Sequence, residues 1–205
     1  MKQVTFIRHA KLEKEFSDYS KLPYNIFCDL AKGSIQPSID SVEARRNLEK
    51  INQKIDFQKF DKIFSANSKR AQQTAVLIAN TYHISIVEYL NELSELHFDP
   101  AQLITESEFK DTGLKTVREK FQRLILGQDS KTNVKMINTK LKMINEILLK
   151  EKSQKILCIT HGFFMHFIKL YFDKTTDLNQ KEILNIDISN PFKNLEGFTI
   201  SLLEK

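Results

Sequence analysis

The stretch VTFIRHA, residues 4–10, decides how the rest of the chain is interpreted. Its first four residues are β-branched or aromatic, which is the composition of a buried strand. The apolar run stops at Arg8 and His9. Either the chain leaves the core for water at this point, or a rigid strand end presents a functional arginine–histidine pair. The residues at the ends of the other strands decide between these two interpretations.

The composition predicts one globular domain. The chain has 205 residues, of which 41% are hydrophobic and 28% are charged, so it is long enough to bury a sizeable core. The net charge is +5, but the basic residues are interleaved with acidic ones and form no block of like charge. We therefore expect a single domain over residues 1–205 and no nucleic-acid partner.

The sequence also carries signals about compartment. Its N-terminus reads as a strand at once, without the apolar region of a signal peptide, and no apolar run approaches the ~20 residues that cross a bilayer. Cys28 and Cys158 lie far apart, and no cysteine pair has the spacing of a zinc site. We expect a cytoplasmic protein with no membrane partner, no disulfide, no metal site and no cofactor. Oligomeric state is not predictable from these patterns.

Strand signals alternate with helical segments along the chain. Beyond the first strand, the strand signals lie at residues 62–65, 84–89, 155–160 and 198–203. This alternation predicts an α/β fold, a three-layer sandwich with a mostly parallel central sheet flanked by helices. Residues 90–154 are mostly helical and are expected to form a cap. Residues 11–40 are expected to form a loop with one short helix, packed over the end of the first strand.

Arginine and histidine side chains lie at or shortly after the ends of three strands. Arg8 and His9 end the first, Arg70 lies in the first turn of the helix after the second, and His161 comes after residues 155–160. Ligands of open α/β sheets bind beyond the carboxyl ends of the strands, so these side chains should meet at one rim. Arginine binds phosphate through a planar fork of donors, and a neutral imidazole can accept a phosphoryl group. The pattern therefore favours a phosphate site over a plain solvated surface.

Four short motifs occur in order along the chain. Arg8-His9 ends the first strand, residues 65–75 read SANSKRAQQTA, residues 90–92 read LNE, and residues 160–162 read THG. Each motif is weak alone, but the ordered set resembles the histidine phosphatase superfamily, the phosphoglycerate-mutase-like group. The resemblance implies that family's fold with a helical cap.

The resemblance also implies catalytic roles. His9 would attack phosphorus and become phosphorylated. Arg8, Arg70 and His161 would bind the phosphate oxygens and the charge that develops on them. Gly162, at the start of the next helix, would add a backbone donor to the phosphate site.

The proton donor of the leaving group has two candidates. The resemblance places it on Glu92, which would protonate the leaving oxygen and then activate water. Glu95 is the second candidate, because the loop register is not readable from sequence. Lys11, Glu95 and His97 are candidates for contacts to the substrate.

Two departures from the family pattern bear on activity. Ala10 stands where the family usually has glycine, and alanine would be strained there if the backbone needs a positive φ. The family often carries an asparagine shortly after the first motif, whereas residues 13–15 here are Glu, Lys and Glu. The second departure argues against mutase activity.

We predict a metal-independent phosphatase of the histidine acid type, which hydrolyses a phosphomonoester through a phosphohistidine on His9. Its expected ligands are a small phosphorylated metabolite and inorganic phosphate. The alternatives are a protein-phosphohistidine phosphatase, a phosphoglycerate-type mutase, and a non-catalytic pseudoenzyme that only binds a phospholigand.

Overall fold

A single mixed sheet organises the computed structural model, which describes residues 1–127, 133–174, 176–187 and 190–203. The five strands in these residues are β1 (Lys2–Arg8), β2 (Lys62–Ala66), β3 (Val87–Leu90), β4 (Lys155–Thr160) and β5 (Gly197–Leu202). Their order is β3-β2-β4-β1-β5. All neighbouring pairs are parallel except β1 and β5, which are antiparallel. The predicted, mostly parallel central sheet is confirmed.

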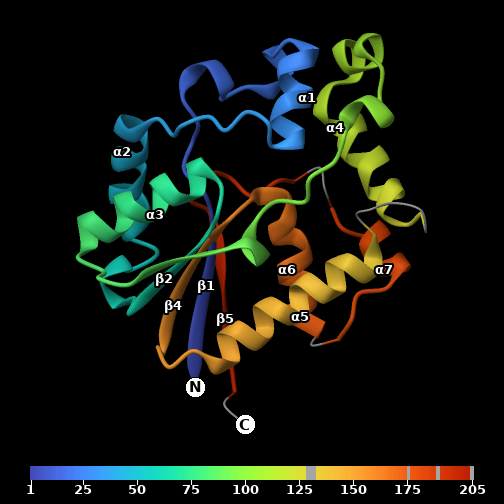
Figure 1. Cartoon of the computed structure of the whole chain (residues 1–205). Helices are drawn as coiled ribbons and strands as arrows, with labels where there is room; N and C mark the ends of the chain where they lie inside the picture. The colour runs from blue at the N-terminus through green and yellow to red at the C-terminus, as the bar shows by residue number, and fades with distance from the viewer. Residues whose placement is uncertain (128–132, 175, 188–189, 204–205) are drawn as a thin grey trace.

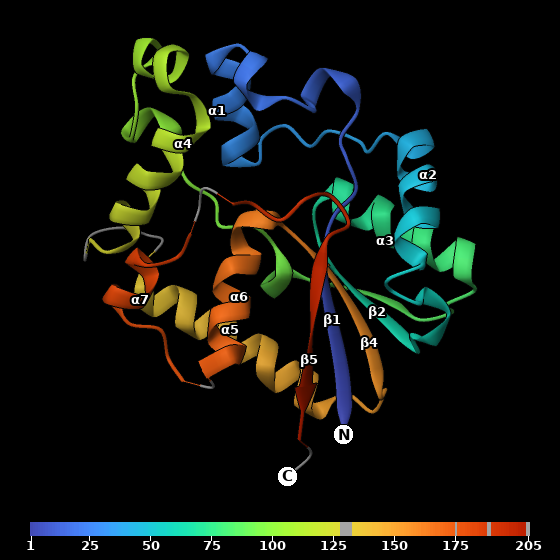
Figure 2. The same cartoon turned by 180° about the vertical axis from the view of Figure 1, so that it is seen from behind.

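Helices cover both faces of the sheet (Figures 1 and 2). They are α1 (Tyr24–Lys32), α2 (Ser41–Asn52), α3 (Lys69–Tyr82), α4 (Glu106–Ile125), α5 (Val134–Lys150), α6 (Gly162–Lys174) and α7 (Gln180–Leu184). Helices α2 and α3 lie on one face, and α5 and α6 lie on the other. Right-handed crossovers explain this division, because the chain moves across the sheet in one direction up to β3 and in the other afterwards. The three-layer sandwich is therefore confirmed.

Five 3₁₀ turns connect these elements in the described part of the chain. They are η1 (Lys14–Phe16), η2 (Tyr19–Lys21), η3 (Phe57–Lys59), η4 (Asn91–Leu93) and η5 (Pro100–Gln102).

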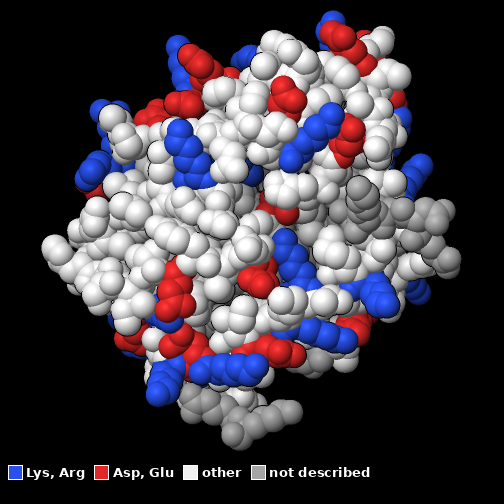
Figure 3. All heavy atoms as spheres, in the orientation of Figure 1, with Lys and Arg blue, Asp and Glu red and all other residues white. Residues whose placement is uncertain are grey.

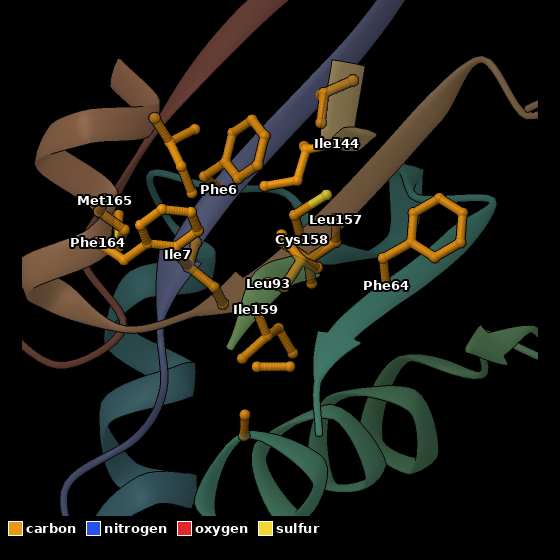
Figure 4. Close-up of a cluster of buried hydrophobic side chains, with 14 of the residues drawn as sticks. Phe6, Ile7, Phe64, Leu93, Ile144, Leu157, Cys158, Ile159, Phe164 and Met165 are labelled. Carbon is orange, nitrogen blue, oxygen red and sulfur yellow. The ribbon is translucent and has the colours of Figure 1, made fainter. Parts of the chain in front are cut away.

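The middle strands, β1 and β4, are buried on both faces. Phe6, Ile7 and Cys158 are essentially inaccessible to solvent, and Phe6 lies opposite Cys158 in the ladder. Figure 4 shows these side chains in one cluster with Ile144 of α5 and Phe164 of α6. Burying one such side chain contributes roughly 1.5–3 kcal/mol. The carboxyl ends of β1 and β4 are therefore held by the dense packing of the core.

The expected cap over residues 90–154 divides into two parts. Helix α4 lies with α1 beyond the carboxyl ends of the strands (Figure 1), where Phe27, Phe109 and Val117 belong to a small second apolar cluster. Helix α5 does not belong to the cap but packs on the sheet, because it carries a continuous apolar stripe. The buried side chains of that stripe are Ile137, Leu141, Ile144 and Leu148. The expected short helix of residues 11–40 is α1, and it supplies the other half of the cap.

Charge on the surface is mixed in sign. On the face drawn in Figure 3, basic and acidic side chains lie interspersed. Charges on the surface are also paired, as in the ion pairs Lys142–Asp177 and Lys169–Asp173. Among the described residues, no helix combines the length and the apolar character of a bilayer span.

An ion pair ties β2 to the end of α5. Nζ of Lys62, whose side chain is 8% exposed, lies 2.6 Å from the carboxylate of Glu151, which is 16% exposed. This hydrogen bond, with two backbone N–H donors from residues 152 and 153, lowers the pKa of Glu151 to about 2. The native state therefore favours the ionised carboxylate, which is the less exposed of the two carboxylates that pair with Lys62. The other is Glu88, 2.7 Å from Nζ and 53% exposed.

We expect the variant Glu151→Gln to be about 1–3 kcal/mol less stable at pH 7, because it leaves a buried ammonium without this carboxylate. Since the pKa is depressed by folding, the contribution is present above the ordinary pKa of 4.5 and disappears as the pH falls towards 2. Urea unfolding at pH 7 and pH 3 measures both effects. The matched control is Glu146→Gln, whose carboxylate is 65% exposed and 3.9 Å from Lys150; an equal loss in both variants would contradict the prediction.

Candidate active site

Two neighbouring strand ends form the centre of the site. Arg8 lies opposite Thr160 in the parallel ladder of β1 and β4, and the N–H of His9 donates to the Thr160 carbonyl at 3.0 Å. The residue that follows each of these strands is a histidine: His9 after β1 and His161 after β4. Their ring centroids lie 5.2 Å apart at 63°. The parallel register thus brings together two imidazoles that are far apart in sequence.

The His9 imidazole is held in one tautomer. Its Nδ1 lies 2.7 Å from the Ala10 carbonyl oxygen, and a carbonyl can only accept, so Nδ1 carries the proton. Nε2 is then left with the lone pair. Burial, with the nearby cations of Arg70 and Arg8, lowers the pKa of His9 well below its usual 6.5. The ring is therefore neutral near pH 7 and has a nucleophilic nitrogen.

Ala10 is accommodated without strain. It is completely buried, and the described non-glycine residues with positive φ are His83 and Leu195, so Ala10 is not among them. Its N–H donates to Oγ1 of Thr74 on α3 at 3.0 Å. The departure from glycine at this position therefore carries no backbone penalty, and the hydroxyl of Thr74 fixes the loop that holds His9.

Arg70 and Ser68 orient the second imidazole. Arg70, in the first turn of α3, donates from Nη2 to Nδ1 of His161 at 3.1 Å. Because Nδ1 accepts, the neutral ring carries its proton on Nε2, which lies 3.2 Å from Oγ of Ser68. Burial and the positive charge of Arg70 lower the pKa of His161 well below 6.5. The sequence patterns did not predict Ser68 as a site residue.

The two arginines have unsatisfied donors. Among the described residues, the buried side-chain nitrogens or oxygens that lack a hydrogen-bond partner are Nε of Arg8 and Nε of Arg70. Arg8 uses Nη1 to donate to the Phe192 carbonyl at 2.8 Å. Buried unsatisfied donors are costly, more so when charged. An anion bound between the two guanidinium groups would relieve that cost.

One cavity of about 80 Å³ collects these side chains. Its lining residues are Arg8, His9, Tyr19, Arg70, Glu95, Arg118, His161, Gly162, Phe163, His166 and Pro191. Gly162 matters here for close approach, because a Cβ at this position would lie 3.0 Å from Cδ of Arg8. The structure therefore brings together six of the expected residues around one volume: Arg8, His9, Arg70, Glu95, His161 and Gly162.

Glu95, rather than Glu92, lines this cavity. Burial raises the pKa of Glu95 even though the cations of Arg70 and Lys140 oppose the shift. Glu92 lies in η4 and is not a lining residue of this cavity or of the two that adjoin it. A carboxyl group with a raised pKa retains its proton more readily, which suits a proton donor.

Lys140 supports the loop that carries Glu95. Its Nζ donates to the Ser94 carbonyl and lies 4.4 Å from the ring centroid of Phe164. Burial lowers the pKa of Lys140 to about 8. This lysine on α5 therefore fixes the backbone next to Glu95.

The two remaining candidates do not line the cavity that holds His9. Lys11 points to α2, where its Nζ is 2.9 Å from the carboxylate of Glu43, so it is not positioned as a substrate contact. His97 lines the adjoining cavities and packs on Gly33, where a Cβ would lie 2.9 Å from Cε1 of the imidazole. Gly33 also has φ +79°, which glycine adopts without strain.

Three cavity residues have no sequence motif. Arg118 lies on α4, Tyr19 in η2 and His166 on α6. Tyr19 belongs to the aromatic segment expected over the end of the first strand, and this expectation is the one feature of the sequence that could have identified it as a site residue. Arg118 has none, because a single arginine on an amphipathic helix is usually a solvated surface residue.

The fold and cavity define an α/β protein with a cavity at the carboxyl edge of its parallel strands, lined by two histidines and two arginines from the sequence motifs. Residues 32–191 match the family model of the histidine phosphatase superfamily (branch 1). The chain therefore belongs to the histidine phosphatase superfamily. The matched range holds Arg70 and His161, whereas Arg8 and His9 precede it and are joined to them by the tertiary structure.

Solved structures show the same fold. A mycobacterial glucosyl-3-phosphoglycerate phosphatase with VO3 has a TM-score of 0.66 at 14% identity, covering 98% of this chain and 93% of that one. YhfR of Bacillus stearothermophilus has a TM-score of 0.63 at 15% identity, covering 98% and 91%.

A third neighbour is phosphoserine phosphatase of Entamoeba histolytica in complex with 3-phosphoglyceric acid. Its TM-score is 0.57 at 18% identity, covering 97% of this chain and 90% of that one. A search of curated protein sequences finds no match. At these identities the likeness shows a shared fold, and together with the family match it supports a phosphatase or mutase type of enzyme.

Proposed function

We propose that this protein is a phosphatase that hydrolyses a phosphomonoester through a phosphohistidine on His9. The observation that carries the proposal is the neutral His9 imidazole, with its free Nε2, in a cavity shared with two arginines that have unsatisfied donors. An anion there gains charge-assisted hydrogen bonds. Phosphoryl transfer needs mainly such positioning and charge stabilisation around an in-line nucleophile.

The chemistry balances with one nucleophile and one acid. Nε2 of His9 attacks phosphorus, the bond from phosphorus to the ester oxygen breaks, and that oxygen takes the proton of Glu95. The Glu95 carboxylate then removes a proton from water, whose oxygen attacks phosphorus and breaks its bond to Nε2. Inorganic phosphate leaves, and both groups return to their starting state. Arg8, Arg70, His161 and the backbone N–H of Gly162 stabilise the phosphate oxygens.

We place the acid on Glu95, with Glu92 as the alternative. Glu95 lines the same cavity as His9 and has a raised pKa. Glu92 does not line that cavity.

The proposal includes catalysis without a metal ion. Among the described residues, no three His, Cys, Asp or Glu side chains gather as a set that could hold one. The chemistry above also needs none, because the arginines supply the positive charge. Activity should therefore persist after exhaustive treatment with a chelator. A cytoplasmic location stays a prediction.

A covalent trapping experiment tests the proposal. The protein is mixed with ³²P-labelled phenyl phosphate, quenched in alkali and digested. The result expected is a label that is stable to alkali, labile to acid and confined to the peptide that holds His9. Binding of phosphate without any labelled peptide, at a rate of hydrolysis equal to background, would instead support the pseudoenzyme.

Two related activities are the alternatives, a mutase and a protein-phosphohistidine phosphatase. Interconversion of phosphoglycerate isomers would support a mutase, and faster release of phosphate from a phosphohistidine protein than from small esters would support a protein phosphatase. The cap of α1 and α4 over the strand ends favours a small substrate over a protein surface (Figure 1).

The pH dependence of kcat/KM should report both groups. Activity requires neutral His9, so it rises with pH through a pKa below 6.5. It also requires protonated Glu95, so it falls as the pH rises through a pKa above the ordinary 4.5. We expect a bell-shaped profile, corrected for the ionisation of the substrate, and loss of its alkaline limb in Glu95→Gln. An alkaline limb that survives in this variant would assign that limb to another group.

A further inference from the structure

A second cavity adjoins the one lined by His9, Arg8 and Arg70, in which the proposed function places the phosphate. It measures about 130 Å³ and lies between α1, α4 and the loop after η4. The two cavities share five lining residues, so they lie side by side. The shared residues are Tyr19, Arg70, Glu95, Arg118 and Phe163.

The walls of the second cavity are mostly apolar. Phe98 and Phe121 stack with ring centroids 4.2 Å apart, and Phe163 lies 5.6 Å from Phe121. The other apolar lining residues come from α1, α4 and the loop after η4. They are Phe27, Leu30, Ala31, Leu96, Leu114 and Val117. Such a lining suits a hydrocarbon group and offers few partners for hydroxyl groups.

Its size suits one ring. Cavities of about 150 Å³ with apolar walls bind benzene in other proteins, and this one is of similar volume. A flat ring would lie among side chains that already stack on one another, an arrangement that aromatic groups favour.

Most polar lining residues of the second cavity lie at its junction with the first; the exception is His97, which lines the second cavity but not the first. Glu95, Arg118 and Tyr19 each line both cavities, whereas most of the remaining lining of the second cavity is apolar. A phosphomonoester with its phosphate between Arg8 and Arg70 would therefore place its ester oxygen near Glu95. The rest of the leaving group would extend into the apolar cavity.

We propose that the leaving group is an alcohol or phenol with an apolar body of about one ring. This inference rests on the proposed phosphatase function and names its substrate class. A sugar or glycerate leaving group would have to bury hydroxyl or carboxylate groups among phenylalanine and leucine side chains. Buried polar groups without partners are strongly disfavoured.

Binding of non-hydrolysable phosphonates tests the substrate class without turnover. Calorimetry on the wild-type protein compares 2-phenylethylphosphonate, ethylphosphonate and 2,3-dihydroxypropylphosphonate. Burying the ring should make the first bind about 10- to 100-fold more tightly than the second. The dihydroxy compound should bind no better than ethylphosphonate. Equal affinities, or tighter binding of the dihydroxy compound, would overturn the inference.

A substitution that fills the second cavity tests whether the ring binds there. Ala31→Phe places a side chain in the cavity wall and should reduce the affinity ratio of phenylethyl- to ethylphosphonate to near one. The matched control is Ala101→Phe, since Ala101 is exposed in η5 and lines neither cavity. The control should keep the wild-type ratio, and an unchanged ratio in Ala31→Phe would count against the cavity as the binding place.

The outcomes separate this inference from the proposed function. A ring preference in binding, without hydrolysis of phenylethyl phosphate, would support the cavity and refute the phosphatase. The second comparison is the hydrolysis of glycerol phosphate and phenylethyl phosphate. If the protein hydrolyses both, with a higher kcat/KM for glycerol phosphate, the phosphatase is supported and the apolar leaving group is refuted.

Discussion

Replacing His9 by alanine should lower the rate of phosphomonoester hydrolysis by about 10⁴-fold or more, as loss of a covalent nucleophile does in other enzymes. The reason is geometric. The Nδ1–H of His9 is bonded to the Ala10 carbonyl, which leaves the lone pair on Nε2, and the residue lines the cavity that also holds Arg8 and Arg70. The steady-state rate with p-nitrophenyl phosphate measures the loss.

Phosphate binding should survive in the same variant. The arginine donors do not depend on His9, and Arg70 keeps its bond to His161. Calorimetric titration with inorganic phosphate should therefore still show binding, which separates lost chemistry from lost folding. The control is His83→Asn, because His83 is an exposed helix cap with φ 58° that asparagine tolerates. Full activity of His9→Ala would rule out the phosphohistidine route.

The second large effect should come from Glu95. We expect Glu95→Gln to reduce kcat by about 10²–10⁴-fold, the usual contribution of a positioned acid or base. Glutamine keeps the shape of the side chain, and its carbonyl oxygen can still accept the hydrogen bond from the Leu96 N–H. The variant therefore removes the acid and little else. Glu92→Gln is the matched control and should have little effect, since Glu92 does not line the cavity.

The leaving group distinguishes an acid from a structural residue. Loss of a proton donor should matter most for an alkyl phosphate, whose alkoxide is a poor leaving group, and least for p-nitrophenyl phosphate. We therefore expect the defect of Glu95→Gln to shrink with the activated ester. An equal defect on both substrates would show that Glu95 only supports the site, and a large defect in Glu92→Gln would return the role to Glu92.

Local patterns in the sequence account for most of the fold. The apolar runs at residues 4–7 and 155–160 become the central strands β1 and β4. A nearly continuous apolar run of this length is typical of a strand whose two faces are both covered by helices. Because β1 and β4 are neighbouring central strands, the positions of Arg8, His9 and His161 follow from the strand ends at which they lie. Parallel strands place their carboxyl ends on one edge, so these side chains had to meet.

Other features depended on contacts between distant segments. Lys11 pairs with Glu43 on α2, and α5 joins the core rather than the cap. The same holds for Arg118, which reaches the cavity only because α4 is folded over the strand ends (Figure 1). A local pattern carries no information on which helix will face which cavity.

The sequence alone determined the sheet, the order of its motifs and the histidines at two strand ends, because these result from local periodicity and from chain direction. Only the tertiary structure decided that Glu95 rather than Glu92 lines the cavity, and that Arg118 reaches it from α4. It also decided that an apolar cavity lies beside this one. The physical reason is that η4 and the loop after it turn several side chains in different directions within a few residues. Their directions are set by packing against α5 and the cap, which no local pattern encodes.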